Sequence, residues 1–490
     1  MPAERLRLAA RPRGRVALCA PRPHTRLCTP AHQRALSLYT ALSLYTAVAP
    51  LLLGLCSHAW RPPAAGSATV FTLVNTILGA GIMSLPAVLK TVGLVPGVVA
   101  IALVALITDI TAGLLLRATD ATDANTYGDT MRRAVGGWAA TTLQVAVVVN
   151  NLGLNIVYLI IMGDCLAGAN GDQGAIAGIL GGESAPAWAT DRVIIMGASC
   201  ALILAPLCVV RSIDTLRFSS YLSAVLMALF VVVMCTLCAK SLAMGSDSPL
   251  SKGVELGPTF APGSSKLGDL VGMLTVFAVM MNSYVCHYNV HALRRALPPP
   301  QRFRMRSAVR WSLASACSVY VLAASAGYAL FGEDTKDDAL DNLSDDRLRQ
   351  LLPGAAGLAT TVKLGYALSL MCTYPAIAWE VREAIVRVVW RGGKGIDQLG
   401  WPVSLLMAYA MVGVAFGISI GVPNIWIAFS FTGATVAVII GFVMPALSAL
   451  RTAPEQVVTP TITLLLGFVV CATGVGNAVY SIVKGNTSSP

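Results

Sequence analysis

The distribution of hydrophobic and polar positions divides the chain into long apolar stretches separated by short polar connections. A helix needs about 20 predominantly apolar residues to cross the hydrocarbon core of a bilayer, and each stretch is close to that length. The pattern therefore predicts an all-α integral membrane protein with eleven transmembrane helices. They are expected at residues 67–89, 94–116, 138–163, 193–210, 218–239, 268–291, 307–331, 356–379, 401–421, 424–447 and 459–483.

Composition agrees with a membrane protein and excludes several other classes. Hydrophobic residues make up 56% of the chain and charged residues 12%, whereas a soluble domain carries about 25% charged residues. The net charge of +11 lies in a leader and in short loops, without interleaved aromatic residues, so we expect no nucleic-acid partner. The 12 cysteines are scattered and form no CxxC pair and no metal-binding spacing with histidine. We expect no enzyme active site, no cofactor, and no metal other than sodium as a coupling ion.

The leader, residues 1–66, differs from the rest of the chain. It is rich in arginine, Glu4 is its only acid, and the hexapeptide ALSLYT occurs twice in tandem. One interpretation is a disordered cytosolic tail, or an error in the gene prediction. The other is an organelle transit peptide, because such peptides are rich in arginine and poor in acids.

Loop charges predict the orientation of the chain. With a cytosolic N-terminus, the arginine-rich loops 117–137, 211–217, 292–306, 380–400 and 448–458 are all cytosolic. The acidic loop 332–355 then lies outside or in a lumen, as does the C-terminal tail 484–490. This is the positive-inside pattern, and it requires an odd number of spans. The sequons at Asn342 and Asn486 both fall on the predicted non-cytosolic side.

The first span is expected to be interrupted at mid-membrane. It contains Asn75, Thr76 and Leu78, followed by Gly79-Ala80-Gly81 and Pro86. Glycine costs a helix about 1 kcal/mol and proline about 3 kcal/mol, and backbone groups freed at mid-membrane have to line a cavity or bind something. The alternative is a tightly packed pair of helices, since glycine also allows close backbone approach.

The sixth span is similarly irregular. It contains Asn282, Ser283, Tyr284, His287, Asn289 and His291, and polar residues this dense inside a span indicate function. The alternative for Asn289 and His291 is a place at the cytosolic mouth. Interrupted helices in equivalent positions of two halves mark the binding site of inverted-repeat transporters. The first and sixth spans are equivalent if the chain consists of two five-helix repeats and one extra helix.

The residues at these interruptions resemble those of the amino acid/auxin permease family, within the amino acid–polyamine–organocation superfamily. The resemblance rests on Asn75 preceding Gly79-Ala80-Gly81, and on the run Tyr284-Val285-Cys286-His287-Tyr288-Asn289-Val290-His291. Thr373-Tyr374-Pro375 followed by Val381-Arg382 is similar to the same branch. That branch holds the sodium-coupled neutral amino acid transporters and the plant and yeast vacuolar amino acid transporters.

The resemblance covers residues 67–483 and implies a LeuT-type fold that transports amino acids by alternating access. Its repeats are expected at 67–239 and 268–447, with the extra helix at 459–483. It also implies a membrane location. The vacuolar membrane or another endomembrane is favoured, the plasma membrane is an alternative, and a plastid is less favoured. The expected partners are an amino acid and the lipid bilayer, with the protein monomeric.

The resemblance also implies a binding site. Substrate is expected at Asn75, Thr76, Leu78, Gly79, Ala80, Gly81, Asn282, Ser283, Tyr284 and His287. Sodium-coupled members bind the ion with residues that match Asn75 and Thr373, and Ser369 lies one turn before Thr373. A polar cluster of Asn150, Asn151 and Asn155 in the third span either packs helices together or forms a wall of the cavity.

The coupling ion is sodium or a proton. Proton coupling needs a titratable group in the pathway, and the candidates are His287, Asp109 and Glu380. For His287 the alternative is a neutral, hydrogen-bonded side chain, and for Asp109 it is an ion pair across helices.

No basic residue lies at the middle of the first or sixth span, which favours neutral amino acids. Lys363 in the eighth span is the one basic residue that complicates this preference. The alternative is that it extends toward the non-cytosolic surface. The alternative function is an amino acid sensor that signals through the cytosolic tail.

Overall fold

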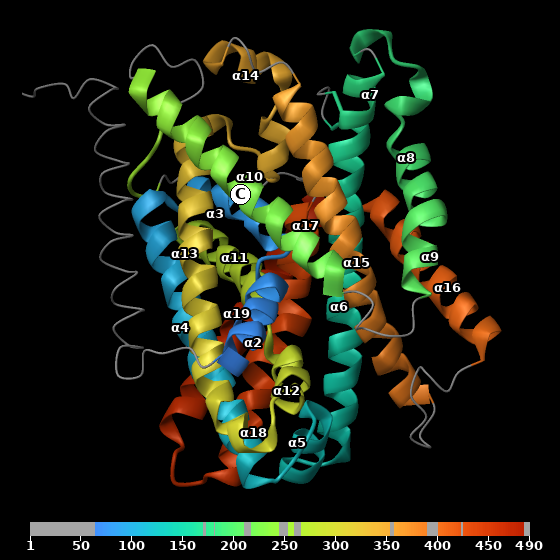
Figure 1. Cartoon of the computed structure of the whole chain (residues 1–490). Coiled ribbons are helices and arrows are strands. Elements are labelled where there is room, and N and C mark those ends of the chain that lie inside the picture. The colour runs from blue at the N-terminus through green and yellow to red at the C-terminus, as the bar shows by residue number, and fades with distance from the viewer. Residues whose placement is uncertain are drawn as a thin grey trace, which may run out of the picture.

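The computed structural model describes residues 64–169, 173–180, 182–209, 217–244, 253–258, 266–352, 357–389, 400–422 and 425–484. Residues 1–63 and the sequon at Asn486 lie outside this part of the chain. Figure 1 shows a bundle of helices that lie side by side along one long axis. Within the described ranges all regular structure is helical.

The first half of the bundle contains the first five predicted spans. α2 begins at Ala64, so the last residues assigned to the leader already belong to the first helix. The helices of this half are α2 (Ala64–Ile77), α3 (Gly81–Val92), α4 (Leu94–Ala121), α5 (Tyr127–Ala134), α6 (Gly137–Ala167), α7 (Ala175–Ile179), α8 (Arg192–Ser199), the π-helix η4 (Cys200–Leu204), α9 (Ala205–Cys208) and α10 (Arg217–Met244).

The second half contains the remaining spans and two irregular connections. Its helices are α11 (Lys266–Tyr284), α12 (His287–Ala296), η7 (Pro299–Arg304), α13 (Met305–Phe331), η9 (Ala339–Asn342), α14 (Asp345–Leu351), α15 (Leu358–Val389), α16 (Trp401–Gly421), α17 (Ile425–Thr432), the π-helices η11 (Gly433–Ala437) and η12 (Ile439–Val443), α18 (Met444–Thr452) and α19 (Val458–Lys484).

The described residues include seven helices that are long and apolar enough to cross a membrane. An eighth span is the pair Thr69–Ile77 and Gly81–Val92, which is bent by 55° at the break between them. The predicted interruption of the first span is therefore present. α8, η4 and α9 together form a shorter apolar helix, and α15 carries Lys363, Glu380 and Arg382 in its apolar sequence.

The two ends of the bundle differ in charge. α5, the end of α12, η7 and the end of α18 lie at one end, and we call this end the basic face (Figure 1). It carries Arg132, Arg133, Arg294, Arg295, Arg304 and Arg451. η9 and α14 lie at the other end, the acidic face, which carries Asp338, Asp341, Asp345 and Asp346.

The sequon at Asn342 does not fit a glycosylated surface loop. Asn342 is buried, its side-chain amide donates to the carbonyl oxygen of Asp334 at 2.6 Å, and its oxygen accepts from the backbone N–H of Lys336 at 2.8 Å. The side chain therefore holds the loop together from inside, and this sequon gives no support to the predicted orientation.

Lys363 does not extend to the surface. It is 3% exposed, and its ammonium group donates to the backbone carbonyl oxygen of Gln173 at 3.2 Å. Asp164 of α6 and Asp338 of the acidic loop lie near enough to interact with its charge. The alternative of a surface lysine was wrong because the acidic loop folds back over this end of α15 and supplies an opposite charge there.

Candidate functional site

The first break lies between α2 and α3. α2 ends at Ile77 and α3 begins at Gly81, with Ala80 as an N-cap whose side chain makes no capping hydrogen bond. Glycine at 79 and 81 reduces the helical propensity of this short segment. In the first turn of α3 the N–H groups of Ile82 and Met83 donate to the carbonyl oxygens of Gly79 and Ala80, at 3.5 Å and 3.1 Å. This end of the helix is the positive end of its dipole.

The second break lies between α11 and α12 and has the same form. α11 ends at Tyr284, α12 begins at His287, and the N-cap Cys286 gives no side-chain hydrogen bond. The predicted irregularity of the sixth span is thus a true interruption of the helix. Its second half also begins with uncapped N–H groups, and such helix N-termini favour anions.

The two breaks are in direct contact. A Cβ atom on Gly81 would lie 2.5 Å from Oγ of Ser283 and 3.0 Å from its Cα, so only glycine fits beside α11 at this point. The hydroxyl of Tyr320 in α13 hydrogen-bonds to the carbonyl oxygen of Ile77 and, at 3.0 Å, to that of Ser283. One buried tyrosine therefore joins the ends of both interrupted helices.

A second tyrosine reaches the first break from α6. A Cβ atom on Gly79 would lie 2.6 Å from the hydroxyl oxygen of Tyr158, and that hydroxyl is hydrogen-bonded to the backbone of Ala80. Sequence analysis did not single out Tyr158 or Tyr320, because a tyrosine in an apolar helix has the same local pattern whether it faces lipid, core or a site.

Asn282 lies buried next to the second break. Within the described part of the chain, neither its amide oxygen nor its amide nitrogen has a hydrogen-bond partner, and the same holds for Asn155 in α6. The junction of α17 with η11 lies between them: Thr432 contacts α6 at Gly153, and Gly433 contacts Asn282 and the backbone of Ala278. Unpaired buried amides are costly, so these groups are suited to a polar ligand.

Asn151 contacts one of the proton-coupling candidates. Its amide nitrogen donates to the carboxylate of Glu380 at 2.9 Å, and its oxygen accepts from the amide of Asn150 at 3.1 Å. Tyr288 of α12 is close enough to interact electrostatically with Glu380. In the described residues no lysine or arginine pairs with this carboxylate. This half-buried carboxylate lies between α6, α12 and α15, with an amide as its hydrogen-bond donor.

Three hydroxyls form a cluster between α10 and α15. Ser223 Oγ lies 2.9 Å from Ser369 Oγ and 2.7 Å from Thr373 Oγ1, and Ser369 also donates to the carbonyl oxygen of Ser223 at 3.2 Å. The structure thus brings Ser369 and Thr373 together and adds Ser223, which sequence analysis missed. Asn75 is on a different helix, half-buried in the last turn of α2, with Thr76 and Leu78 beside it. Hydroxyl and carbonyl oxygens are suitable ligands for a hard cation.

His287 and His291 are both buried against α4. Nε2 of His287 lies 2.8 Å from the hydroxyl of Thr111, and Nε2 of His291 lies 2.8 Å from that of Thr119. Each threonine hydroxyl donates to a backbone carbonyl of its own helix, so each imidazole donates its Nε2 hydrogen. His291 is therefore part of a packed contact and does not lie at an open mouth. Asn289 is also buried, with 8% of its surface exposed.

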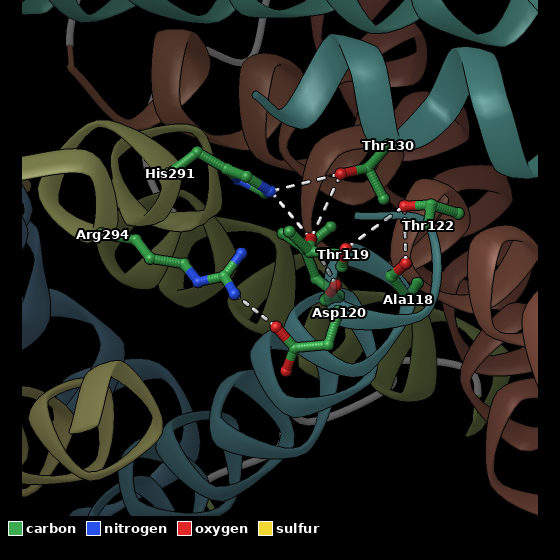
Figure 2. Close-up of polar contacts among 8 residues, drawn as sticks. Ala118, Thr119, Asp120, Thr122, Thr130, His291 and Arg294 are labelled. Carbon is green, nitrogen blue, oxygen red and sulfur yellow. Dashed lines mark hydrogen bonds and ion pairs between the residues drawn. The ribbon is translucent and has the colours of Figure 1, made fainter. Parts of the chain in front are cut away.

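Figure 2 shows the contacts of His291 at the basic face. Thr130 of α5 lies 3.4 Å from Nε2, and the ring of Tyr127 stacks on the imidazole with centroids 5.4 Å apart. Nearby, Arg294 forms an ion pair with Asp120 at the end of α4. These contacts attach the second half of the sixth span to α4 and α5.

Asp109 is the third proton-coupling candidate, and it is paired. Its two carboxylate oxygens accept from Arg306 at 2.6 Å each, and Arg310 lies 3.4 Å away. Sequence gave no partner for Asp109, because both arginines are about 200 residues distant in the chain. Of the two interpretations of Asp109, the structure therefore shows the ion pair across helices, with Arg306 as the partner.

The geometry defines a multi-pass membrane protein built around two interrupted helices that meet inside the bundle. The chain belongs to the family described as "Transmembrane amino acid transporter protein", which matches residues 65–485. It is therefore a transporter and not an enzyme.

Relatives with similar sequences bear the same type of name. "Amino acid transporter AVT6B" of Arabidopsis thaliana is 34% identical over 412 residues, which cover 83% of this chain and 86% of the relative. "Amino acid transporter AVT6E" of the same plant is 35% identical, with 78% and 75% covered. Among solved structures, "Inward facing conformation of Mhp1" matches with a TM-score of 0.49 and 13% identity, covering 86% of this chain and 93% of that one.

Proposed function

We propose that this protein is a secondary active transporter of neutral amino acids that works by alternating access around the two breaks. The observation that carries the proposal is the contact of Gly81 with Ser283, through which the two interrupted helices meet. The eleven spans are proposed to form inverted repeats at 67–239 and 268–447, with the helix at 459–483 outside them.

We propose that the substrate is bound mainly by backbone groups. The uncapped N-termini of α3 and α12 attract its carboxylate, and the carbonyls freed near the breaks accept from its amino group. Asn282, with its unpaired buried amide, and Ser283 complete the polar contacts. Lys363, the lysine of the eighth span, donates to the carbonyl oxygen of Gln173 at 3.2 Å and interacts with Asp164, which favours a substrate with a neutral side chain.

For the coupling ion we favour a proton carried by Glu380. The support is that this carboxylate is half-buried in the bundle, is hydrogen-bonded by Asn151, and has no cationic partner among the described residues. The carboxylate of Asp109 is held by arginines, and His287 is held by Thr111. Sodium remains the alternative, with Ser223, Ser369 and Thr373 as ligands together with Asn75.

We propose an endomembrane location, with the basic face in the cytosol and the acidic face in the lumen. Clustered arginines at one end and clustered aspartates at the other support this orientation, because cytosolic loops carry an excess of basic residues.

Proteoliposomes test the function directly. The purified full chain is reconstituted, and a panel of labelled neutral, acidic and basic amino acids is offered under an imposed proton gradient, sodium gradient or no gradient. We expect accumulation of neutral amino acids only under the proton gradient. No transport of any amino acid under either gradient would contradict the proposal, and accumulation under sodium alone would assign the ion to the hydroxyl cluster.

A further inference from the structure

A cavity of about 300 Å³ opens at the side of the bundle near the basic face, apart from the two breaks. It lies between α4, the first turns of α13, and the connection from α18 to α19. Its polar lining consists of Asp109, Arg117, Arg306, Arg310, Gln456 and Thr459. None of the residues at the breaks lines it, so the transport site does not account for it.

The cavity carries an excess of positive charge. Three arginines face one acid, because Asp109 is the only carboxylate in its lining. Asp109 is already engaged by Arg306 through both oxygens. Arg117 and Arg310 both lie close enough to repel the guanidinium of Arg306. Positive charges at the edge of a bilayer core are costly unless they are paired, so a bound anion would stabilise this arrangement.

Two of the arginines keep most of their hydrogen-bond donors available. Each guanidinium has five N–H donors. In the described part of the chain, Arg310 makes one contact, from Nε to Asp109 at 3.4 Å, and Arg117 makes one, to the amide oxygen of Gln456 at 2.8 Å. In the first turn of α19 the N–H groups of Val458 and Thr459 precede the first acceptor within the helix, whereas Pro460 has no N–H and Thr461 donates to the carbonyl oxygen of Val457 at 3.0 Å.

The cavity opens toward the lipid. Leu106 and Ile110 belong to its lining, and each is 37% exposed. Val99 and Leu103 continue the same exposed stripe along α4, at the spacing of one helical face. An anion bound by the arginines of this cavity therefore lies beside an apolar surface that runs along α4.

We propose that this cavity binds the headgroup phosphate of an anionic phospholipid from the leaflet at the basic face. Arg117 and Arg310 donate charge-assisted hydrogen bonds to the phosphate oxygens, and the acyl chains lie along the stripe from Val99 to Ile110. Basic cavities between transmembrane helices are known to hold such headgroups, and about 300 Å³ is the lower end of the size range for ligand sites. The proposal is independent of the proposed transport function.

Native mass spectrometry of the full chain in detergent tests the site. The protein is mixed with phosphatidylcholine, phosphatidylglycerol or phosphatidylinositol 4-phosphate, and separately with inorganic phosphate. The test variant is the double substitution Arg117→Gln and Arg310→Gln, and the matched control removes two arginines outside the cavity, Arg132→Gln and Arg304→Gln. If the double variant does not fold, Arg310→Gln alone is used, because this side chain is 45% exposed and makes one long contact.

We expect both anionic lipids to be retained and phosphatidylcholine to be lost. The double variant should weaken anionic-lipid binding about tenfold or more, as expected for the loss of charge-assisted bonds, and the control should bind as the unmodified chain does. Equal retention of phosphatidylcholine would overturn the proposal, as would equal weakening in the control. Binding of inorganic phosphate as tight as that of lipid would show that the lipid is not the ligand.

Discussion

The side-chain amide of Asn151 donates a hydrogen bond of 2.9 Å to the carboxylate of Glu380, from one long helix of the bundle to another. α6 and α15, which carry these residues, pack against each other over their length. The pair therefore joins a polar cluster in the third span to an acidic residue in the eighth. It places Glu380, a carboxylate with no cationic partner among the described residues, at a contact between two major helices.

Replacement of the Glu380 carboxylate by an amide tests proton coupling without an expected effect on folding. Glu380→Gln keeps an oxygen that accepts from Asn151, so we expect the variant to fold but to lose accumulation under a proton gradient, by at least tenfold. Exchange of labelled substrate across liposomes without a gradient should persist. Glu455→Gln, at an exposed position, is the matched control. Proton-driven accumulation at the normal level in Glu380→Gln would rule out Glu380 as the proton carrier.

Gly81→Ala should abolish transport. The added methyl group would lie within 3.0 Å of both the side chain and the backbone of Ser283, so the two breaks would have to move apart. We expect uptake to fall at least tenfold. Gly413→Ala in α16 serves as the control, because nothing lies within 4 Å of a Cβ atom there. Equal uptake by the two variants would mean that the contact of the breaks is not needed.

Tyr320→Phe removes the hydroxyl that joins Ile77 and Ser283 while it keeps the ring. Because two buried carbonyls lose the one hydroxyl hydrogen that they share, we expect the loss of about 1–3 kcal/mol of stability, measured as a lower melting temperature in detergent. Transport should fall more than stability alone explains. Tyr409→Phe, at a residue 44% exposed, should change neither.

Asp338→Asn should stabilise the protein at neutral pH. Burial, and then the nearby charge of Asp341, raise the pKa of the Asp338 carboxyl well above its usual range. The folded state therefore binds a proton that the unfolded state releases, and stability falls as pH rises above the unfolded pKa. Asparagine removes this dependence and retains an oxygen for the backbone N–H of Leu340. The melting temperatures of the two proteins should converge in acid and diverge at neutral pH; a constant difference would contradict this.

Asn342 should remain unglycosylated in cells that attach N-linked glycans. Its amide is buried and hydrogen-bonded to Asp334, so a glycan has no room in the folded loop. Treatment with a glycosidase should leave the mobility of an Asn486→Gln variant unchanged on a gel. A mobility shift that disappears on a further Asn342→Gln substitution would refute the burial of this side chain.

The sequence predicted those features of the fold that depend on neighbouring residues in the chain. The break at Gly79-Ala80-Gly81 and the one after Tyr284 were predicted because glycine and clustered polar residues weaken a helix wherever it packs. Their positions, as the first and sixth spans of two five-helix repeats, then related the two breaks to each other. The binding of substrate and ion by the residues around them stays a prediction.

Contacts between distant segments could not be predicted in the same way. Ser223 joins Ser369 and Thr373 only because α10 crosses α15, and a serine in an apolar helix gives no sign of its partner. A surface position for Lys363 stayed open because Asp338, which interacts with its charge, lies in a loop whose path the sequence pattern does not specify. The pairing of Asp109 with Arg306 depends on the same kind of long-range packing.

α13 connects two regions that otherwise look separate. This helix is continuous for 27 residues, about 40 Å at 1.5 Å per residue. It carries Arg306 near its first turn and Tyr320 about 21 Å farther along, by the same rise per residue. α13 therefore places two arginines of the cavity, Arg306 and Arg310, and the tyrosine that joins both half-helices on one continuous element.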